Sequence, residues 1–388
     1  MDISQSRMDE IQSPLIPVIG ELIAQNPDTI SLGQGVVYYP PPPEAIESIT
    51  KFSLDANNHK YKSVQGIPPL LEAITKKLGE DNRTPVAENQ SIFVTAGSNM
   101  AFINTVFAIT QPDDEIILLT PYYFNHEMAI RMANCHPVLV PTDDHYQPRL
   151  DAIAGAITPK TKAIVTISPN NPTGVVYPES SLRSINKLCK DNNLYHISDE
   201  AYEYFTYNDI PHFSPCTIEN SSDHTISLFS LSKSYGFASW RIGYQLIPSH
   251  LLMAMKKVQD TILICPPVIS QYAAIGALQA GKNYSTKHLD TIASIRQLYL
   301  DELVKIKDIV TVSDANGAFY FFLKVKSKDD SFTLAKKLIT DHRVAVIPGN
   351  TFGMETGCYL RVAYGSLTPQ MAKEGIKRLV QGLKTLCK

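Results

Sequence analysis

Residues 162–202 read KAIVTISPNNPTGVVYPESSLRSINKLCKDNNLYHISDEAY, and the alternation inside this stretch decides the fold class. It opens on a short apolar run, Lys162–Ile167, and closes on a second run, Leu194–Ile197, with a longer and more polar stretch between them. Apolar strands interleaved with helices are typical of a mostly parallel sheet that helices cover on both faces. The stretch therefore predicts an α/β fold.

The alternation continues in both directions along the chain. It predicts three further strands, at Ser91–Thr95, Glu115–Leu119 and Thr225–Phe229. The C-terminal part differs, because a helical stretch at 331–340 is accompanied by three strand-like runs: Gly317–Lys324, Arg343–Ile347 and Tyr359–Ala363. This mixture predicts a smaller α+β unit.

The length of 388 residues predicts two domains, at roughly 100–200 residues for each. We predict a large domain over residues 41–285, built on the mostly parallel sheet, and a small α+β domain built from both termini, residues 1–40 and 286–388. The four prolines of Pro40–Pro43 have fixed φ angles and lack amide donors, so they predict a stiff connector between the two domains.

Composition counts against several classes of function. Hydrophobic residues make up 44% of the chain, and the net charge of −3 favours neither nucleic acid nor an anionic membrane surface as a partner. Six cysteines occur without any Cys-x-x-Cys pair, which argues against a zinc site and a dense disulfide framework. No apolar run approaches the roughly 18 residues of a membrane span, and residues 1–14 lack the apolar core of a signal peptide. We expect a cytoplasmic protein.

Polar side chains follow four of the predicted strands, where ligands bind in parallel α/β sheets. The strand-end groups, in chain order, are Gly97, Ser98 and Asn99, then Asn171, then Asp199 and Tyr202, and last Ser230, Lys233 and Arg241. Because the carboxyl ends of parallel strands meet at one edge of the sheet, we expect these groups to project into one crevice.

This set of groups matches the needs of pyridoxal 5'-phosphate (PLP). The Lys233 amine would hold the cofactor as a Schiff base and move the α-proton of a substrate as base and acid. The Asp199 carboxylate would keep the pyridine nitrogen protonated. Asn171 and Tyr202 stand where donors to the 3'-oxygen of the ring are expected. No metal site is predicted.

The cofactor phosphate needs backbone N–H groups at a helix N-terminus and a fixed cation. Residues Gly97, Ser98 and Asn99 would supply the N–H groups, and Arg241 would supply the cation. The Ser230 hydroxyl can add a further hydrogen bond.

The motifs Asn171-Pro-Thr-Gly, Asp199-x-x-Tyr202, Ser230-x-x-Lys233 and Arg241 occur together in one known family, in this order and near these spacings. The sequence resembles the fold-type-I PLP-dependent aminotransferases of class I/II over nearly the whole chain, from SLGQG near residue 31 to YLRVAYG near residue 359. The resemblance implies two half-reactions, in which an L-amino acid gives up its amino group and a 2-oxo acid takes it back. GQGVV, PYYFNH, KVQD and ICPPVISQ look most like the aromatic and methionine aminotransferases.

The same resemblance implies roles for further residues. Tyr123 would stack on the pyridine ring, and His126 would contact the carboxylate at the ring nitrogen. A backbone group of Gly35 would meet the substrate, Asn171 would also contact it, and the guanidinium of Arg361 would bind the substrate α-carboxylate. Tyr61 would reach the phosphate in the neighbouring subunit, which implies a homodimer with shared active sites.

Substrate preference depends on a position that the resemblance also identifies. Relatives that prefer aspartate and glutamate place an arginine of the partner subunit a few residues before a Pro-Pro pair. Here the pair is Pro266-Pro267, and the matching position is Asp260, which would repel a second substrate carboxylate. We expect Val36, Tyr38 and Ile262 to line the remaining space, and we expect an aromatic amino acid or methionine as the amino donor.

Three alternatives differ in what they require. PLP-dependent lyases and synthases share most of this cofactor shell, so the motifs leave them open. A PLP-sensing regulatory domain needs a DNA-binding module, but the roughly 40 residues before the proline run carry no helix-turn-helix pattern or basic patch. Ser-x-x-Lys is also the motif of penicillin-binding serine enzymes, which require Ser-Asp-Asn and Lys-Thr-Gly motifs that this sequence lacks.

Overall fold

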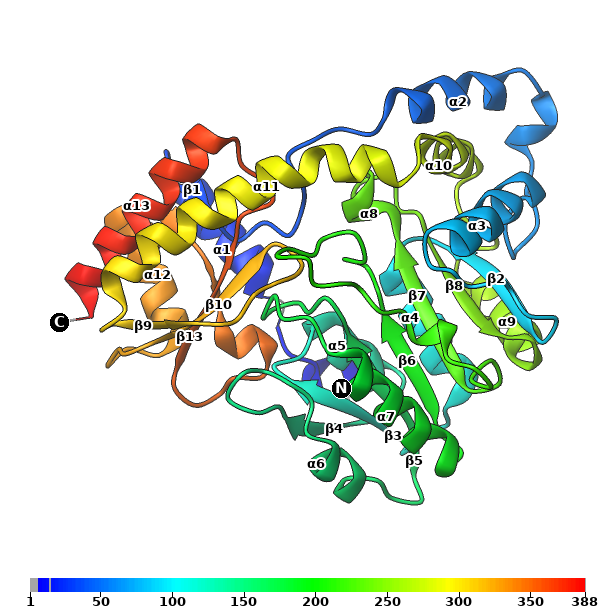
Figure 1. Ribbon diagram of the computed structural model, residues 1–388, viewed down its shortest axis with the longest axis horizontal. Helices are drawn as coiled ribbons and strands as arrows, with labels where there is room; N and C mark the ends of the chain where they lie inside the picture. The colour runs from blue at the N-terminus through cyan, green and yellow to red at the C-terminus, as the bar shows by residue number, and fades with distance from the viewer. Residues whose placement is uncertain (1–5, 14, 388) are drawn as a thin grey trace, which may run out of the picture.

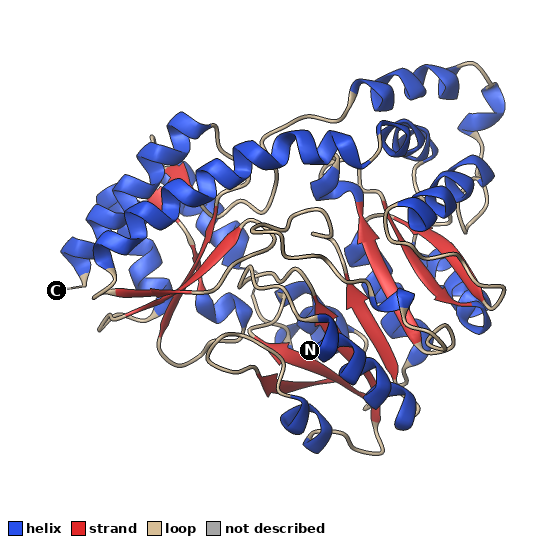
Figure 2. Cartoon of the chain, in the orientation of Figure 1, coloured by secondary structure: helices blue, strands red, loops and turns tan. Residues whose placement is uncertain are grey.

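The computed structural model describes residues 6–13 and 15–387 (Figures 1 and 2). The prediction that residues 1–14 form no signal peptide falls partly on residues 1–5 and 14, which lie outside the described residues, as does residue 388. Within the described ranges, the structure contains no helix that is both long enough and apolar enough to cross a bilayer.

A seven-stranded sheet forms the centre of the larger part of the molecule (Figure 2). Its strands, in spatial order, are β2 (Gln90–Thr95), β8 (Gly243–Pro248), β7 (Thr225–Ser230), β6 (Tyr195–Asp199), β5 (Thr161–Ile167), β3 (Glu115–Thr120) and β4 (His136–Pro141). Only β8 runs antiparallel to its two neighbours, β2 and β7, within this sheet. The sheet is therefore mostly parallel, as predicted.

Side chains of β3 show why both faces of the sheet are covered. Ile116 and Leu118 point into a core shared with Phe102 of α4 (Ser98–Ile109). The alternate residues Ile117 and Leu119 point into a different core, which the helix α7 (Glu179–Asp191) covers. Since successive side chains of a strand leave opposite faces, an apolar run without alternation requires a helix on each side.

The remaining helices of this part complete the two layers. They are α2 (Pro43–Ser53), α3 (Pro68–Glu80), α5 (Phe124–Met132), α6 (Leu150–Gly155), α9 (Leu252–Ile262) and α10 (Val268–Ala280), with the one-turn helix α8 (Leu231–Ser234). The proline run leads directly into α2, because Pro43 is the first residue of that helix.

The smaller part combines segments from both ends of the chain, which confirms the predicted α+β unit. An antiparallel sheet has the order β12 (Ile347–Pro348), β13 (Cys358–Ala363), β10 (Tyr320–Val325) and β9 (Val310–Val312). Three helices, α11 (Lys282–Leu303), α12 (Ser331–His342) and α13 (Pro369–Leu386), accompany it. From the N-terminal side come α1 (Leu15–Gln25) and β1 (Ile30–Ser31), and β1 pairs in parallel with β11 (Val344–Ala345).

The structure corrects the sequence analysis at two places. The predicted strand Arg343–Ile347 is broken at Val346, because its first half pairs with β1 and its second half with β13. Buried apolar residues fill both halves, so the sequence carries no sign of the change of sheet. The strands β4 and β8 were not among those predicted. The domain limits remain a prediction, and the limit at residue 285 falls inside α11, the long helix that joins the two parts in Figure 1.

Candidate active site

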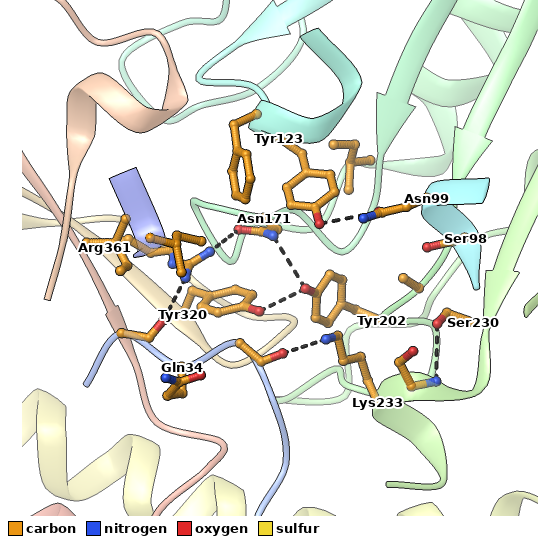
Figure 3. Close-up of a pocket in the computed structure, with 18 of the residues that line it drawn as sticks. Gln34, Ser98, Asn99, Tyr123, Asn171, Tyr202, Ser230, Lys233, Tyr320 and Arg361 are labelled. Atoms are coloured by element: carbon orange, nitrogen blue, oxygen red, sulfur yellow. Dashed lines mark hydrogen bonds between the residues drawn. The ribbon is translucent and has the colours of Figure 1, made fainter. Parts of the chain in front are cut away.

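The strand-end residues surround a cavity of about 240 Å³ (Figure 3). The predicted residues that line it are Gly35, Ser98, Asn99, Tyr123, Asn171, Asp199, Tyr202, Ser230, Lys233, Arg241 and Arg361. They come from the carboxyl ends of the parallel strands, from the loop after β1, and from β13 of the smaller part. The structure thus brings together groups that lie far apart in the sequence.

Lys233 lies on the one-turn helix α8, immediately after β7. Its Nζ donates a hydrogen bond to the carbonyl oxygen of Gly35 over 2.5 Å, and the hydroxyl of Tyr39 donates to the Lys233 carbonyl over 3.0 Å. Burial first, and then the nearby Arg361 and Arg241, lower the pKa of the Lys233 amine to about 8, and Asp199 opposes them. A lower pKa leaves more of the amine neutral near pH 7, and only the neutral amine is nucleophilic.

Asp199 is the last residue of β6, and it is 4% exposed. Its Oδ1 accepts a hydrogen bond from the amide of Ala201, and its Oδ2 lies 3.2 Å from Nε2 of His126. The His126 ring is itself buried and stacks on Phe102, with 3.9 Å between the ring centroids. A buried carboxylate is costly unless it has a positive or donating partner, so the cavity face of Asp199 suits a protonated ring nitrogen.

Arg361 and Asn171 lie on the side of the cavity away from Ser98 and Ser230 (Figure 3). The guanidinium donates through Nη1 to Asn171 Oδ1 over 2.9 Å and through Nη2 to the carbonyl of Gly33 over 2.8 Å. Arg361 is 3% exposed, and among the described residues it forms no ion pair, while its Nε has no hydrogen-bond partner. A buried guanidinium without an anionic partner suits the carboxylate of a ligand.

Tyr202 connects Asn171 to a residue that the sequence analysis did not identify. Its hydroxyl accepts a hydrogen bond from Asn171 Nδ2 over 3.4 Å and lies 2.8 Å from the hydroxyl of Tyr320. Burial, first of all, raises the pKa of Tyr202 well above its ordinary value, so this phenol stays protonated and can donate. Tyr123 closes the cavity nearby, with its hydroxyl 3.4 Å from Asn99 Oδ1.

A cradle for an anion lies at the start of α4. The residue before this helix, Gly97, has a φ of 83° and leaves the helix N-terminus without a side-chain cap. A Cβ at Gly97 would lie 2.3 Å from Nη2 of Arg241, so only glycine admits the guanidinium there. The Ser230 hydroxyl, which accepts a hydrogen bond from the amide of Ser232, lies on the same side of the cavity. Helix N–H groups and a guanidinium together fit a phosphate.

The remaining wall of the cavity is apolar. Three isoleucines of α1 contribute to it at a spacing of three and four residues: Ile16, Ile19 and Ile23. Phe124 and Ile347 complete this wall. Residues spaced in this way share one face of a helix, so the periodicity of α1 was a usable signal that the sequence analysis did not use. Tyr320 gave no such signal, because it stands inside the uniformly apolar run GAFYFF.

Other expected residues lie elsewhere in the single chain. Tyr61 is 78% exposed and borders a separate hollow beside Pro266 and Pro267. Val36, Tyr38 and Ile262 were expected along the substrate pocket, but none of them lines the cavity of the described chain; the Tyr38 hydroxyl contacts His288 Nδ1 at 3.1 Å instead. Asp260 is exposed on α9.

These features fit pyridoxal 5'-phosphate at three independent points. The glycine-lined cradle with Arg241 suits the phosphate, and the buried Asp199 suits the ring nitrogen. The Lys233 amine, with its lowered pKa, suits the aldehyde carbon. The roles of the individual residues remain predictions.

Comparison with known proteins gives a consistent result along the whole chain. The sequence model of the family described as Aminotransferase class I and II matches residues 27–379. An aromatic aminotransferase of Arabidopsis thaliana is 33% identical over 382 residues, which cover 96% of this chain and 94% of that protein. An aspartate aminotransferase of Pyrococcus abyssi is 30% identical over 386 residues, which cover 97% of each chain.

Solved structures agree with the sequence comparisons. An aspartate aminotransferase from Thermus thermophilus, solved with maleate, has a TM-score of 0.90 at 29% identity, with 98% of this chain and 100% of that chain covered. An aromatic aminotransferase from Pyrococcus horikoshii has a TM-score of 0.85 at 29% identity, with 95% and 99% covered.

Proposed function

The chain belongs to the class I and II aminotransferases, and we propose that its amino donor is an aromatic L-amino acid or methionine. The protein is a PLP-dependent transaminase, which acts on amino acids and 2-oxo acids. The relatives carry names of both aromatic and aspartate aminotransferases, so the donor has to be argued from the cavity.

The apolar wall of the cavity carries this proposal. An aromatic side chain gains roughly 25 cal/mol for each Å² of apolar surface that it buries against Ile16, Ile19 and Phe124. A second substrate carboxylate would instead lose its hydration there, and without a cation this loss is costly.

The cations that line the cavity in the described chain are already assigned. In this proposal Lys233 binds the cofactor, Arg241 binds its phosphate, and Arg361 binds the α-carboxylate of the substrate; all three line the cavity. None of these three is left for a side-chain carboxylate. This supports a donor with an uncharged side chain.

We expect kcat/KM for phenylalanine, tyrosine, tryptophan or methionine to exceed that for aspartate by at least about tenfold, a ratio within the range that side-chain pockets achieve. The measurement is a half-reaction screen that follows the absorbance of the enzyme-bound cofactor with each amino acid. Lysine, arginine and ornithine belong in the screen as well. If Asp260 reaches the site from the partner subunit, its carboxylate would attract the cationic side chain of such a substrate. A clear preference for aspartate would overturn this specificity.

We propose a separate role in catalysis for each of the residues that line the cavity and face the cofactor or the substrate. When bound, the cofactor supplies an electron-withdrawing ring that makes the α-proton of an attached amino acid acidic. Arg361 binds the substrate carboxylate and fixes the orientation of the Cα–H bond. Lys233 Nζ would hold the cofactor and, as a free amine, would take this proton from the substrate and give it back. Asp199 would hold a proton on the ring nitrogen, while Asn171 and Tyr202 would donate hydrogen bonds to the ring oxygen.

We also propose that the active unit is a homodimer with shared sites. Exposed apolar side chains support this: Tyr61 and Ile269 line the same hollow, and Leu54, Ile262 and Ile264 are exposed as well. Large exposed apolar patches are typical of interfaces. Ile264 has a φ of 68°, a strained conformation for a β-branched residue, and the loop that holds it lies beside the hollow at Tyr61.

A mixed dimer tests the shared site. A Lys233→Ala subunit combined with a Tyr61→Ala subunit leaves one site with both changes and one site with neither, if Tyr61 acts across the interface. We expect the mixture to recover up to about half of the wild-type activity per heterodimer, since one of two sites is intact. In the control, Lys233→Ala is mixed with Asp199→Ala, and activity should stay low because both residues belong to the same chain's site. Equal results in the two mixtures would argue against a contribution from Tyr61.

A further inference from the structure

Two buried tyrosine hydroxyls meet in the cavity, and they come from different parts of the molecule. Tyr320 is the first residue of β10 and is 1% exposed, and its Oη lies 2.8 Å from Oη of Tyr202 (Figure 3). Glycine at position 35 makes room for this hydroxyl, because a Cβ there would lie 2.8 Å from Tyr320 Oη. Tyr320 and Gly35 both line the cavity.

The neighbours of Tyr202 determine which way its hydrogen bonds run. A guanidinium can only donate, so the bond from Arg361 to Asn171 Oδ1 turns the amide nitrogen of Asn171 toward Tyr202. The Tyr202 oxygen thus accepts from Asn171. Either hydroxyl can donate across the 2.8 Å contact with Tyr320. When Tyr320 is the donor, the proton of Tyr202 is free to point at a ligand.

We propose that Tyr320 is a positioning residue, whose hydroxyl donates to Tyr202 and so directs the Tyr202 proton to the ring oxygen of the bound cofactor. This inference rests on the cofactor site proposed above. Two donors on one phenol oxygen polarise its O–H bond, which makes Tyr202 a stronger donor to the cofactor. Tyr320 acts through Tyr202 and does not itself carry out a chemical step.

The aromatic ring of Tyr320 has a second contact that can be separated from its hydroxyl. Cζ of Arg361 lies 4.6 Å from the centroid of the Tyr320 ring, within the range of a cation–π interaction. Replacement by phenylalanine removes the hydroxyl and keeps this contact. The other titratable or charged groups that face Tyr202 and Lys233 are unchanged by it: Asp199 of β6, Arg241 after α8, Arg361 of β13 and Tyr123 before α5.

The test is a pH titration of the absorbance of the bound cofactor in the Tyr320→Phe holoenzyme, which needs no turnover. A donor at the ring oxygen withdraws electron density and disfavours protonation of the lysine nitrogen beside it. A weaker donor therefore moves the titration midpoint upward. We expect a shift of about half a pH unit for Tyr320→Phe and about one unit for Tyr202→Phe, the size of one hydrogen bond. KM for the amino acid should change less than about twofold, because the ring under Arg361 remains.

A double variant separates this role from a structural one. If Tyr320 acts through Tyr202, the shift caused by Tyr320→Phe disappears when Tyr202 is already phenylalanine, whereas independent effects would add. Tyr207→Phe is the matched control, because the Tyr207 hydroxyl is buried in the same core and donates to the Ala318 carbonyl over 2.7 Å but does not line the cavity. It should leave the titration midpoint unchanged.

The outcomes distinguish this inference from the site on which it rests. A shift with Tyr202→Phe and none with Tyr320→Phe, or additive shifts in the double variant, would overturn the role of Tyr320 alone. An unchanged midpoint in both single variants would overturn the assignment of Tyr202 to the ring oxygen, and the role of Tyr320 with it.

Discussion

Lys233→Ala is expected to abolish multiple turnover, with a loss in kcat of at least about 1,000-fold, because we propose this side chain as both the attachment point of the cofactor and the base. Its position supports both tasks. The amine lies at the end of β7 inside the cavity, and burial holds its pKa at about 8, so a neutral amine is available near pH 7. Steady-state transamination with the preferred amino acid measures the loss.

The Lys233→Ala protein should still bind the cofactor. The cradle of Gly97, Ser98 and Arg241 is untouched, so dialysed protein should retain cofactor phosphate while it loses the visible absorbance of the covalent lysine bond. Lys187→Ala is the control, because this lysine is exposed in an ion pair with Asp191, and it should behave as wild type. Near-normal turnover by Lys233→Ala would refute the central assignment.

Asp199→Ala is expected to lower kcat by about 100- to 1,000-fold, the range seen when one preorganised electrostatic partner is removed. Among the described residues that line the cavity, Asp199 is the only acidic one, so its removal takes away the group that would favour a proton on the ring nitrogen. Cofactor binding should survive through the cradle. The measurement is kcat beside the cofactor content of the purified protein.

Asp199→Asn separates charge from shape. The amide can keep the hydrogen bond from Ala201 but carries no negative charge, so activity should remain low if the charge is what matters. Asp314→Ala serves as the control, because Asp314 is exposed and pairs with His145 on the surface. Full activity in Asp199→Ala would remove this carboxylate from the mechanism.

Much of the fold, and the meeting of the candidate site residues in one cavity, could be predicted from the sequence because both depend on local patterns. Short runs without alternation, such as Glu115–Leu119, require burial on both faces, and this indicates a covered parallel sheet. Polar residues directly after such runs then have to meet at one edge, which is where Asn171 and Lys233 lie. Local pattern and global arrangement agree at these points.

The rest could not be predicted because it depends on contacts between distant segments. The sequence neighbours of Tyr320 are apolar, and nothing near it in the sequence indicates a polar role. Its hydroxyl contacts that of Tyr202, which lies 118 residues away in the sequence. The run breaks at Val346 because β11 pairs with β1 and β12 pairs with β13. Both halves are buried, so the burial pattern does not reveal the break. In the proposal, Asp260 and Tyr61 contribute to the active site of the neighbouring subunit. The structure of a single chain shows where they lie but not the residues that they would contact.

The pairing of β1 with β11 has a consequence for synthesis of the chain. Ile30 leaves the ribosome early, and its partner Val344 is made only near the end. At roughly 5–20 residues per second, the N-terminal segment waits on the order of 15 to 60 seconds for its docking surface. The residues of the phosphate cradle, up to Arg241, emerge well before Arg361 of β13. The nascent chain therefore contains the residues of the cradle before it contains Arg361, while Ile19 of α1 still lacks Val344 and the other late residues of its core.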